Sequence, residues 1–249
     1  MAQARIIVLR PQPGATATAQ ALRAAGHDPL VCPLFAIEQV AWTPADPQAY
    51  DALLVGSANV FRHGGPSLAD LKDLPVYAVG GKTARMALDL GFRVRGQGQG
   101  GLAAMLPMLA EDGHIHILRL AGEDHVDLPD SRLAIDTRIV YRSRALPMPQ
   151  ALRDALAHPD NESAIQPAVV LLHSARAVEH FSTLVDQAGL DRGRIRLALF
   201  APALRDAAGE GWAEVRVAAS TDDRALLDVA GALCQHAARL QQAQKPETQ

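Results

Sequence analysis

Residues 76–92 read VYAVGGKTARMALDLGF, and this stretch decides the fold. Its first four residues are apolar, which is typical of a buried strand in a parallel sheet. Gly80 and Gly81 then permit a tight turn into a helix. Met86 and Leu90 lie four residues apart and predict the buried stripe of that helix. Gly91 is expected to end the helix as its C-terminal cap.

The start of this helix is a candidate anion site. The first amides of a helix have no partner within the helix, and the helix dipole favours negative charge there. Gly81, Lys82 and Thr83 supply such amides, an ammonium and a hydroxyl. These groups suit a carboxylate or a phosphate. A turn that only caps its own helix accounts for the same residues equally well.

The second half of the chain repeats the pattern. Gly211-Trp212 follows Gly91-Phe92 after 120 positions, and each pair closes a strand, a turn and a helix. Residues 53–61 (LLVGSANVF) likewise match residues 170–178 (VLLHSARAV). Two copies this long predict two similar half-domains that face each other across a cleft, rather than a solenoid.

Composition sets the class of protein. The chain has 249 residues, 49% of them hydrophobic, and a formal charge of −3. A length of this size allows two small domains, and the charge gives no general attraction to nucleic acid or to an anionic membrane. Cys32 and Cys234 stand in no metal-binding pattern, no apolar run has membrane-spanning length, and no signal peptide is recognised. We therefore expect a reduced, soluble protein of the cytoplasm.

Alternating strand and helix patterns predict parallel sheets flanked by helices. Two extended segments interrupt the alternation and are interpreted as crossings between the halves. The fold expected is α/β, with two similar parallel-sheet lobes joined by a two-stranded linker, the first lobe being discontinuous. The boundaries are 1–35 plus 147–240 for the first lobe, 41–138 for the second, 36–40 and 139–146 for the linker strands, and 241–249 for a disordered tail.

Several details of the pattern can be checked. The loop 158–166 is polar and expected to be exposed. The segment 102–110 has apolar residues at spacings of three and four, typical of a helix that buries one face, and Pro107 is expected to bend it. The two crossings form a hinge on which the expected cleft opens and closes.

A set of short segments, in this order and spacing, resembles the uroporphyrinogen-III synthase family over about residues 5–235. The segments are Leu9-Arg10-Pro11, residues 55–60 (VGSANV), residues 78–84 (AVGGKTA) with Gly91-Phe92, residues 118–123 (LRLAGE), residues 139–142 (IVYR) and residues 173–178 (HSARAV).

The resemblance implies an enzyme that inverts one ring of the linear tetrapyrrole hydroxymethylbilane and closes it. It implies two α/β lobes that hold this small-molecule substrate, no cofactor and no metal, and we expect a monomer. Tyr141 matches the tyrosine that family members place on the returning crossing, and a phenol there could donate a proton to the leaving hydroxyl or only position it. The substrate-binding candidates are Arg10, Ser57, Ala58, Gly81, Lys82, Thr83, Arg119, Ser174, Ala175, Pro202 and Ala203.

The chain departs from the family in two places. Family members read Gly-Pro-Thr-Thr-Ala in the second repeat, whereas residues 200–204 read FAPAL, which removes the turn glycine and the hydroxyls. Leu9 stands where a threonine is usual. These changes are expected to weaken the binding of anions by one lobe. They favour the alternative function, which is a non-catalytic two-lobed protein that binds a tetrapyrrole or another polycarboxylate.

Each candidate has a structural explanation beside the functional one. Tyr141 also fits a half-buried strand tyrosine, Ser57 and Ser174 fit helix N-caps, and most arginines are solvated surface. Capping and ligand contact are compatible for a serine.

Two further motifs are set aside. The segment 96–101 (GQGQGG) matches the dinucleotide fingerprint formally, but it comes late in the chain and lacks the acidic residue at the end of the next strand, so a flexible glycine loop is favoured. His114 and His116 could share one strand face, yet no third metal ligand is evident. The segment 122–125 (GEDH) is likewise considered as a metal site, and a turn and helix start are preferred for it.

Overall fold

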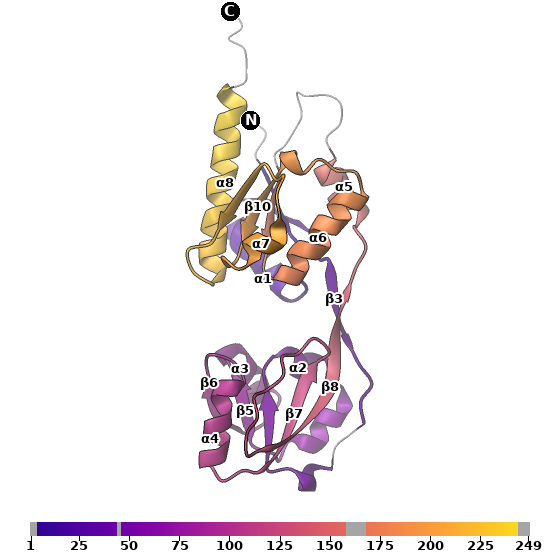
Figure 1. The fold of residues 1–249 in the computed structure, drawn as a ribbon, viewed down its shortest axis with the longest axis vertical. Coiled ribbons are helices and arrows are strands. Elements are labelled where there is room, and N and C mark those ends of the chain that lie inside the picture. Colours follow the sequence, from indigo (N-terminus) through magenta and orange to yellow (C-terminus); the bar gives the residue numbers. More distant parts are fainter. Residues whose placement is uncertain (1–3, 44–45, 158–167, 244–249) are drawn as a thin grey trace, which may run out of the picture. The chain divides into compact units, whose positions relative to one another are not determined.

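The computed structural model describes residues 4–43, 46–157 and 168–243. Contacts divide the chain into two compact units. Unit 1 comprises Met1–Ala36 with Ala145–Gln249, and unit 2 comprises Ile37–Arg144. Each unit has its own sheet, and each is described by itself (Figure 1).

Unit 1 is built on a sheet of strand order β11-β10-β9-β1-β2, in which every neighbouring pair is parallel. Helices cover both of its faces. Its strands are β1 (Arg5–Val8), β2 (Leu30–Val31), β9 (Ala168–Leu172), β10 (Ile195–Leu199) and β11 (Glu214–Val217), and its helices are α1 (Gly14–Ala24), α5 (Gln150–Leu156), α6 (Ala175–Gln187), α7 (Leu204–Ala208) and α8 (Asp223–Ala243).

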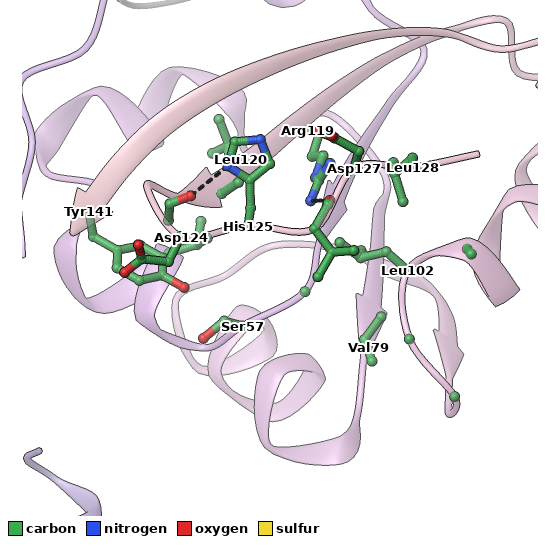
Figure 2. Close-up of a pocket in the computed structure, with 18 residues that line it drawn as sticks. Ser57, Val79, Leu102, Arg119, Leu120, Asp124, His125, Asp127, Leu128 and Tyr141 are labelled. Carbon is green, nitrogen blue, oxygen red and sulfur yellow. Dashed lines mark hydrogen bonds between the residues drawn. The ribbon is translucent and has the colours of Figure 1, made fainter. Parts of the chain in front are cut away.

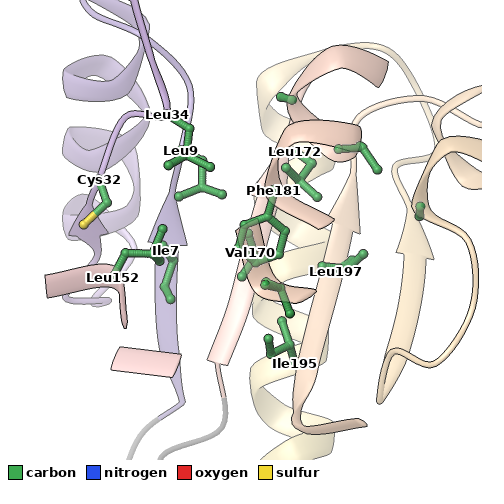
Figure 3. Packing of buried hydrophobic residues seen from close by; sticks show 14 of the residues in the cluster. Ile7, Leu9, Cys32, Leu34, Leu152, Val170, Leu172, Phe181, Ile195 and Leu197 are labelled. Carbon is green, nitrogen blue, oxygen red and sulfur yellow. The ribbon is translucent and has the colours of Figure 1, made fainter. Parts of the chain in front are cut away.

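Successive residues of β1, together with Leu9 directly after it, contribute to the two cores of unit 1 in turn, because side chains alternate along a strand. Ile7 and Leu9 join a core with α5, α6 and α7, where Phe181 is fully buried (Figure 3). Ile6 and Val8 join a second core with α1 and α8. Burial on both faces explains why these strands are continuously apolar.

Unit 2 has a sheet of order β3-β8-β7-β4-β5-β6, and the pairs from β8 to β6 are parallel. Leu53 and Val55 of β4 face one core, while Ala52 and Leu54 face the other. Its elements are β3 (Phe35–Gln39), β4 (Ala52–Val55), α2 (Asn59–His63), β5 (Val76–Val79), α3 (Gly81–Asp89), β6 (Val94–Gly98), α4 (Leu106–Glu111), β7 (His116–Gly122) and β8 (Ala134–Ala145), with short 3-10 turns at Pro47–Ala49, Pro66–Leu71 and Ala103–Met105. The α/β class with parallel strands is thus confirmed.

The stretch 76–92 forms β5, a turn and α3. Gly80 has a φ of +77° and Gly91 a φ of +83°. Both lie in a backbone conformation that glycine adopts readily and other residues rarely adopt. The predicted stripe of α3 is only half correct, because Met86 packs against the core but Leu90 does not. Leu90 is 41% exposed, and the residues buried against the sheet are Thr83, Ala84 and Ala87. The helix lies close to the sheet, and small side chains fill that contact.

The glycine segment 96–101 is not simply a flexible loop, because Gly96 and Gly98 lie inside β6. A Cβ on Gly96 would lie 2.5 Å from the Tyr77 ring, and one on Gly98 would lie 2.2 Å from the sulfur of Met105. Glycine is therefore needed in this strand for close packing rather than for flexibility.

Two other expectations are decided by single segments of the structure. The segment 102–110 is a 3-10 turn followed by α4, and Pro107 lies in the first turn of α4 instead of bending a longer helix. Residues 241–243 continue α8, so the expected tail does not begin at 241. The loop 158–166 and residues 244–249 lie outside the described residues.

Both passages of the chain from one unit to the other run along paired strands. The boundary between Ala36 and Ile37 falls within β3, and that between Arg144 and Ala145 falls at the end of β8. These two strands are neighbours in the sheet of unit 2. Within the described ranges, no helix has the length and apolar character required to cross a bilayer.

Candidate functional site

A pocket of about 440 Å³ opens in unit 2 where β4, β5 and β7 end (Figure 2). Val79, Leu102 and Leu128 contribute apolar wall, and Ser57 and Tyr141 contribute hydroxyls. Parallel sheets commonly bind ligands at the carboxyl ends of their strands, because loops and helix starts gather there. The pocket lies at that edge.

Tyr141 reaches this pocket from β8 and is half-buried. Its main chain is fixed, because the amide of Glu123 donates a hydrogen bond of 2.9 Å to the Tyr141 carbonyl. The ring also lies near His63, with 6.5 Å between the ring centroids. The phenol is therefore held on one wall of the pocket.

Arg119 lies on β7 beneath the same pocket and is only 3% exposed. Its Nη2 donates a hydrogen bond of 2.7 Å to the carbonyl of Val126, as Figure 2 shows. Burial lowers the pKa of the guanidinium, and the charge of Asp127 partly offsets this effect. The Nε atom is buried without a partner among the described residues. Arg119 thus holds the loop 123–128 over the edge of the sheet.

Ser57 lines the pocket and lies just before α2, but it is not the N-cap of that helix. Its Oγ accepts a hydrogen bond of 3.2 Å from the amide of Asn59 at the start of α2. Ala58 is the N-cap residue and is buried. The expected N-cap role of Ser57 is therefore wrong, because Ala58 occupies the N-cap position and α2 has no side-chain cap.

Three other candidates of unit 2 lie at the start of α3 and do not line this pocket. Gly81 and Lys82 are exposed, whereas Thr83 is 5% exposed. The structure brings together Ser57, Arg119 and Tyr141, and it places the start of α3 apart from them.

The candidates of unit 1 lie where its strands lead into helices. Ser174 caps α6, since its Oγ accepts a hydrogen bond of 3.2 Å from the Ala177 amide, and Ala175 is the first residue of that helix. Pro202 and Ala203 are exposed just before α7. Arg10 follows β1 and is partly buried.

Sequence reasoning missed a cluster around Arg10. Its Nη1 lies 2.8 Å from Oδ1 of Asp223, 3.2 Å from Nε2 of His173 and 3.3 Å from Oγ1 of Thr18. The His173 ring stacks on Phe200 at 5.4 Å between centroids. Burial, and then the charge of Arg10, lower the pKa of His173 to about 4, although Asp223 opposes the shift. The unusual Phe200 was the one signal of this arrangement in the sequence.

The acidic wall of the unit 2 pocket was also missed. Asp124 and Asp127 line it. Asp124 lies on the segment 122–125, for which a turn is expected, and Asp127 follows that segment. The helix start also expected there is wrong, because residues 123–128 form an irregular loop. The His125 Nδ1 atom lies 3.0 Å from the Gly122 carbonyl, which closes that turn. In the part of the chain that the structure describes, no group of three or more His, Cys, Asp or Glu residues could hold a metal ion.

The sequence profile of the uroporphyrinogen-III synthase HemD family matches residues 16–228. The chain belongs to the uroporphyrinogen-III synthase family, HemD. This membership confirms the predicted resemblance and the predicted class of activity, a cyclising lyase that converts hydroxymethylbilane with ring inversion and loss of water. Nothing found favours the non-catalytic alternative.

Solved structures of HemD proteins share the fold. A uroporphyrinogen-III synthetase from Helicobacter pylori superposes with a TM-score of 0.63 at 16% identity, over 92% of this chain and 99% of that one. A mutant uroporphyrinogen III synthase from Thermus thermophilus gives a TM-score of 0.50 at 19% identity, over 93% and 99% of the two chains. No curated protein matches this chain by sequence. At these identities the structures support the fold, and the family match supports the activity.

Proposed function

We propose that this HemD chain closes hydroxymethylbilane to uroporphyrinogen III by using the unit 2 pocket for the reacting end of the substrate, and that it does so as a cytoplasmic monomer without a cofactor. The observation that carries the proposal is the convergence of Tyr141, Ser57 and Arg119 on one pocket from three different strands and their loops. Two hydroxyls and a mainly apolar wall suit a pyrrole ring with polar substituents.

Tyr141 is the proton donor in this proposal. The phenol gives its proton to the substrate hydroxyl, the C–O bond breaks with its electron pair on oxygen, and water leaves. The remaining azafulvene cation forms a C–C bond to the substituted carbon of the last ring. In the resulting spiro intermediate the older bond from that carbon to the methylene of the preceding ring breaks, and the methylene bonds instead to the free α-carbon of the last ring. The free α-carbon of that ring finally loses a proton, so that one water is released overall and the phenolate regains a proton.

The acidic wall fits the cation better than it fits the substrate carboxylates. Asp124 and Asp127 repel a carboxylate and attract the positive charge that develops when water leaves. Arg119 supports this wall, because it holds the Val126 carbonyl and lies near Asp127. We therefore propose that the role of Arg119 is to maintain the shape and the charge of the pocket.

The remaining candidates are proposed as contacts for the carboxylate side chains of the substrate. Helix starts offer amides to such groups, and α3 and α6 are the longer helices that begin at candidate residues. These candidates are Arg10, Ala58, Gly81, Lys82, Thr83, Ser174, Ala175, Pro202 and Ala203. Holding a flexible chain in this way favours inverted closure over the spontaneous uninverted reaction.

The test uses purified full-length protein and freshly prepared hydroxymethylbilane with no added cofactor. Oxidised products are separated into type I and type III isomers by chromatography. We expect excess type III isomer from the wild type, and a decrease of about 100- to 10,000-fold in its rate of formation for Tyr141→Phe, the range that general acid catalysis typically supplies. Type I isomer alone, at the spontaneous rate, contradicts the enzyme function.

A further inference from the structure

Gly122 is the last residue of β7 and pairs with Tyr141 of β8. The register of this parallel pair is irregular just before it. Ala121 lies opposite Ile139, whereas Gly122 lies opposite Tyr141, so Val140 is the extra residue of a bulge. Val140 is fully buried, and the bulge therefore turns Tyr141 toward the strand end at the pocket.

The Tyr141 ring lies directly against the Cα of Gly122. A Cβ at residue 122 would lie 2.6 Å from both Cε2 and Cζ of Tyr141 and 2.9 Å from its hydroxyl oxygen. Carbon atoms in contact normally stay about 3.5–4.0 Å apart. Gly122 is not among the described glycines with positive φ, so its backbone conformation does not demand glycine. Glycine is required at residue 122 because the Tyr141 ring occupies the space that a side chain would need.

Tyr141 cannot easily relieve such a clash by moving its main chain. Its carbonyl accepts the hydrogen bond from Glu123, the residue after Gly122, and its neighbour Val140 is packed in the core. A methyl group at residue 122 would instead rotate the ring about its side-chain bonds. The hydroxyl, at the end of the ring, would move furthest.

We propose that Gly122 is a positioning residue for Tyr141: by lacking a side chain it lets the phenol lie flat on the end of β7 and sets where its hydroxyl stands in the pocket. This inference rests on the proposed role of Tyr141 as proton donor. A donor must stand about 2.6–3.2 Å from the atom that it protonates, and a misplacement of about 1 Å can cost about 100-fold in rate.

The test compares Gly122→Ala, Tyr141→Phe and the double variant in the isomer assay. Gly122→Ala is expected to lower kcat for type III isomer by about 10- to 100-fold, with a smaller change in KM. The double variant is expected to be no slower than Tyr141→Phe, because the misplaced group is already gone. When Tyr141→Phe is slowed, a wild-type kcat for Gly122→Ala, or losses that multiply in the double variant, overturns the inference.

Gly231→Ala is the matched control. Gly231 lies in α8 of unit 1, where the nearest atom to an added Cβ is Nε2 of His27 at 4.0 Å, and its φ is not positive. This glycine-to-alanine change is expected to leave the isomer assay unaltered.

A structural readout separates this inference from the proposed function. In protein with ¹³C-labelled tyrosine rings, the Tyr141 signal is assigned by its loss in Tyr141→Phe, and we expect Gly122→Ala to shift it more than the signals of Tyr50 and Tyr77. If Tyr141→Phe keeps full activity while the signal still shifts, the catalytic role fails and the positioning stands. An unshifted signal refutes the positioning.

A folding defect is also informative. If Gly122→Ala does not fold, Tyr141→Ala added to it removes the ring that the methyl meets. Recovery of the folded state in that double variant supports the contact, and a persistent defect contradicts it.

Discussion

The guanidinium of Arg10 is already paired within unit 1, since its Nη1 atom lies 2.8 Å from Oδ1 of Asp223. Their side chains are 26% and 44% exposed, so this is a partly solvated ion pair. A substrate carboxylate that binds Arg10 must compete with Asp223. The pair therefore lowers the affinity of this site for anions while it holds the arginine in place.

Asp223→Asn is expected to lower the KM for hydroxymethylbilane by up to about fivefold, which corresponds to the upper range of about 1 kcal/mol for such a pair. Steady-state kinetics at low salt measure the change. Asp186→Asn, which breaks the comparable pair with Arg192 elsewhere in unit 1, is the control and is expected to leave KM unaltered. An unchanged or raised KM for Asp223→Asn argues against substrate binding by Arg10.

His173 makes stability depend on pH. Its pKa is lowered from 6.5 to about 4 in the folded protein, mainly by burial. Between these two values the unfolded chain binds more protons than the folded one, so folded-state stability is complete above about pH 6.5 and is lost as pH falls toward 4. The groups that face the ring are Arg10, Asp223 and Phe200.

The size of this effect is about 3 kcal/mol across that window. Urea unfolding at pH 7.0, 5.5 and 4.5 is expected to show a steeper loss of stability for the wild type than for His173→Gln, which does not titrate. Parallel pH profiles for the two proteins would falsify the assignment.

Arg119→Gln is expected to release the loop 123–128. The variant loses the hydrogen bond from the charged guanidinium to the Val126 carbonyl, and a bond of this kind contributes about 1.5–3 kcal/mol. Hydrogen exchange should accelerate in that loop more than in β4, and formation of type III isomer should slow. Unaltered exchange in the loop would show that Arg119 does not hold it.

Tyr77→Phe is a matched counterpart to Tyr141→Phe at the other edge of the same sheet. The Tyr77 side chain is fully buried, and its hydroxyl donates to Asp112 and lies 2.9 Å from Nε2 of His114. Burial first, and then the hydrogen bond to Asp112, raise the pKa of Tyr77 to about 12. Removing this hydroxyl should lower the free energy of unfolding by about 1–2 kcal/mol.

Activity is the discriminating measurement for Tyr77→Phe. Residues 77, 112 and 114 lie near the amino ends of β5 and β7, whereas the pocket is formed at their carboxyl ends. The isomer ratio is therefore expected to stay that of the wild type. A loss of type III isomer equal to that of Tyr141→Phe would mean that loss of any buried phenol hydroxyl impairs the enzyme.

Much of the candidate site could be predicted from the sequence as separate pieces. Ser57, Arg119 and Tyr141 are each candidates through the family resemblance of separate segments, and they meet because β4, β7 and β8 are neighbours in one parallel sheet. The acidic wall was not identified, because Asp124 and Asp127 lie on an irregular loop with no periodic pattern. Such a loop is placed only by its contacts, here the hydrogen bond from Arg119.

Local sequence was sufficient for the alternation of strands and helices, and for the turn and cap glycines Gly80 and Gly91, because these features depend on periodicity and on φ at single residues. Packing between distant segments decided the rest. It left Leu90 exposed, required glycine at residue 96 beside the Tyr77 ring, and paired Arg10 with Asp223. It also laid Tyr141 on Gly122, since residues far apart in sequence come within contact distance only when the sheet has formed.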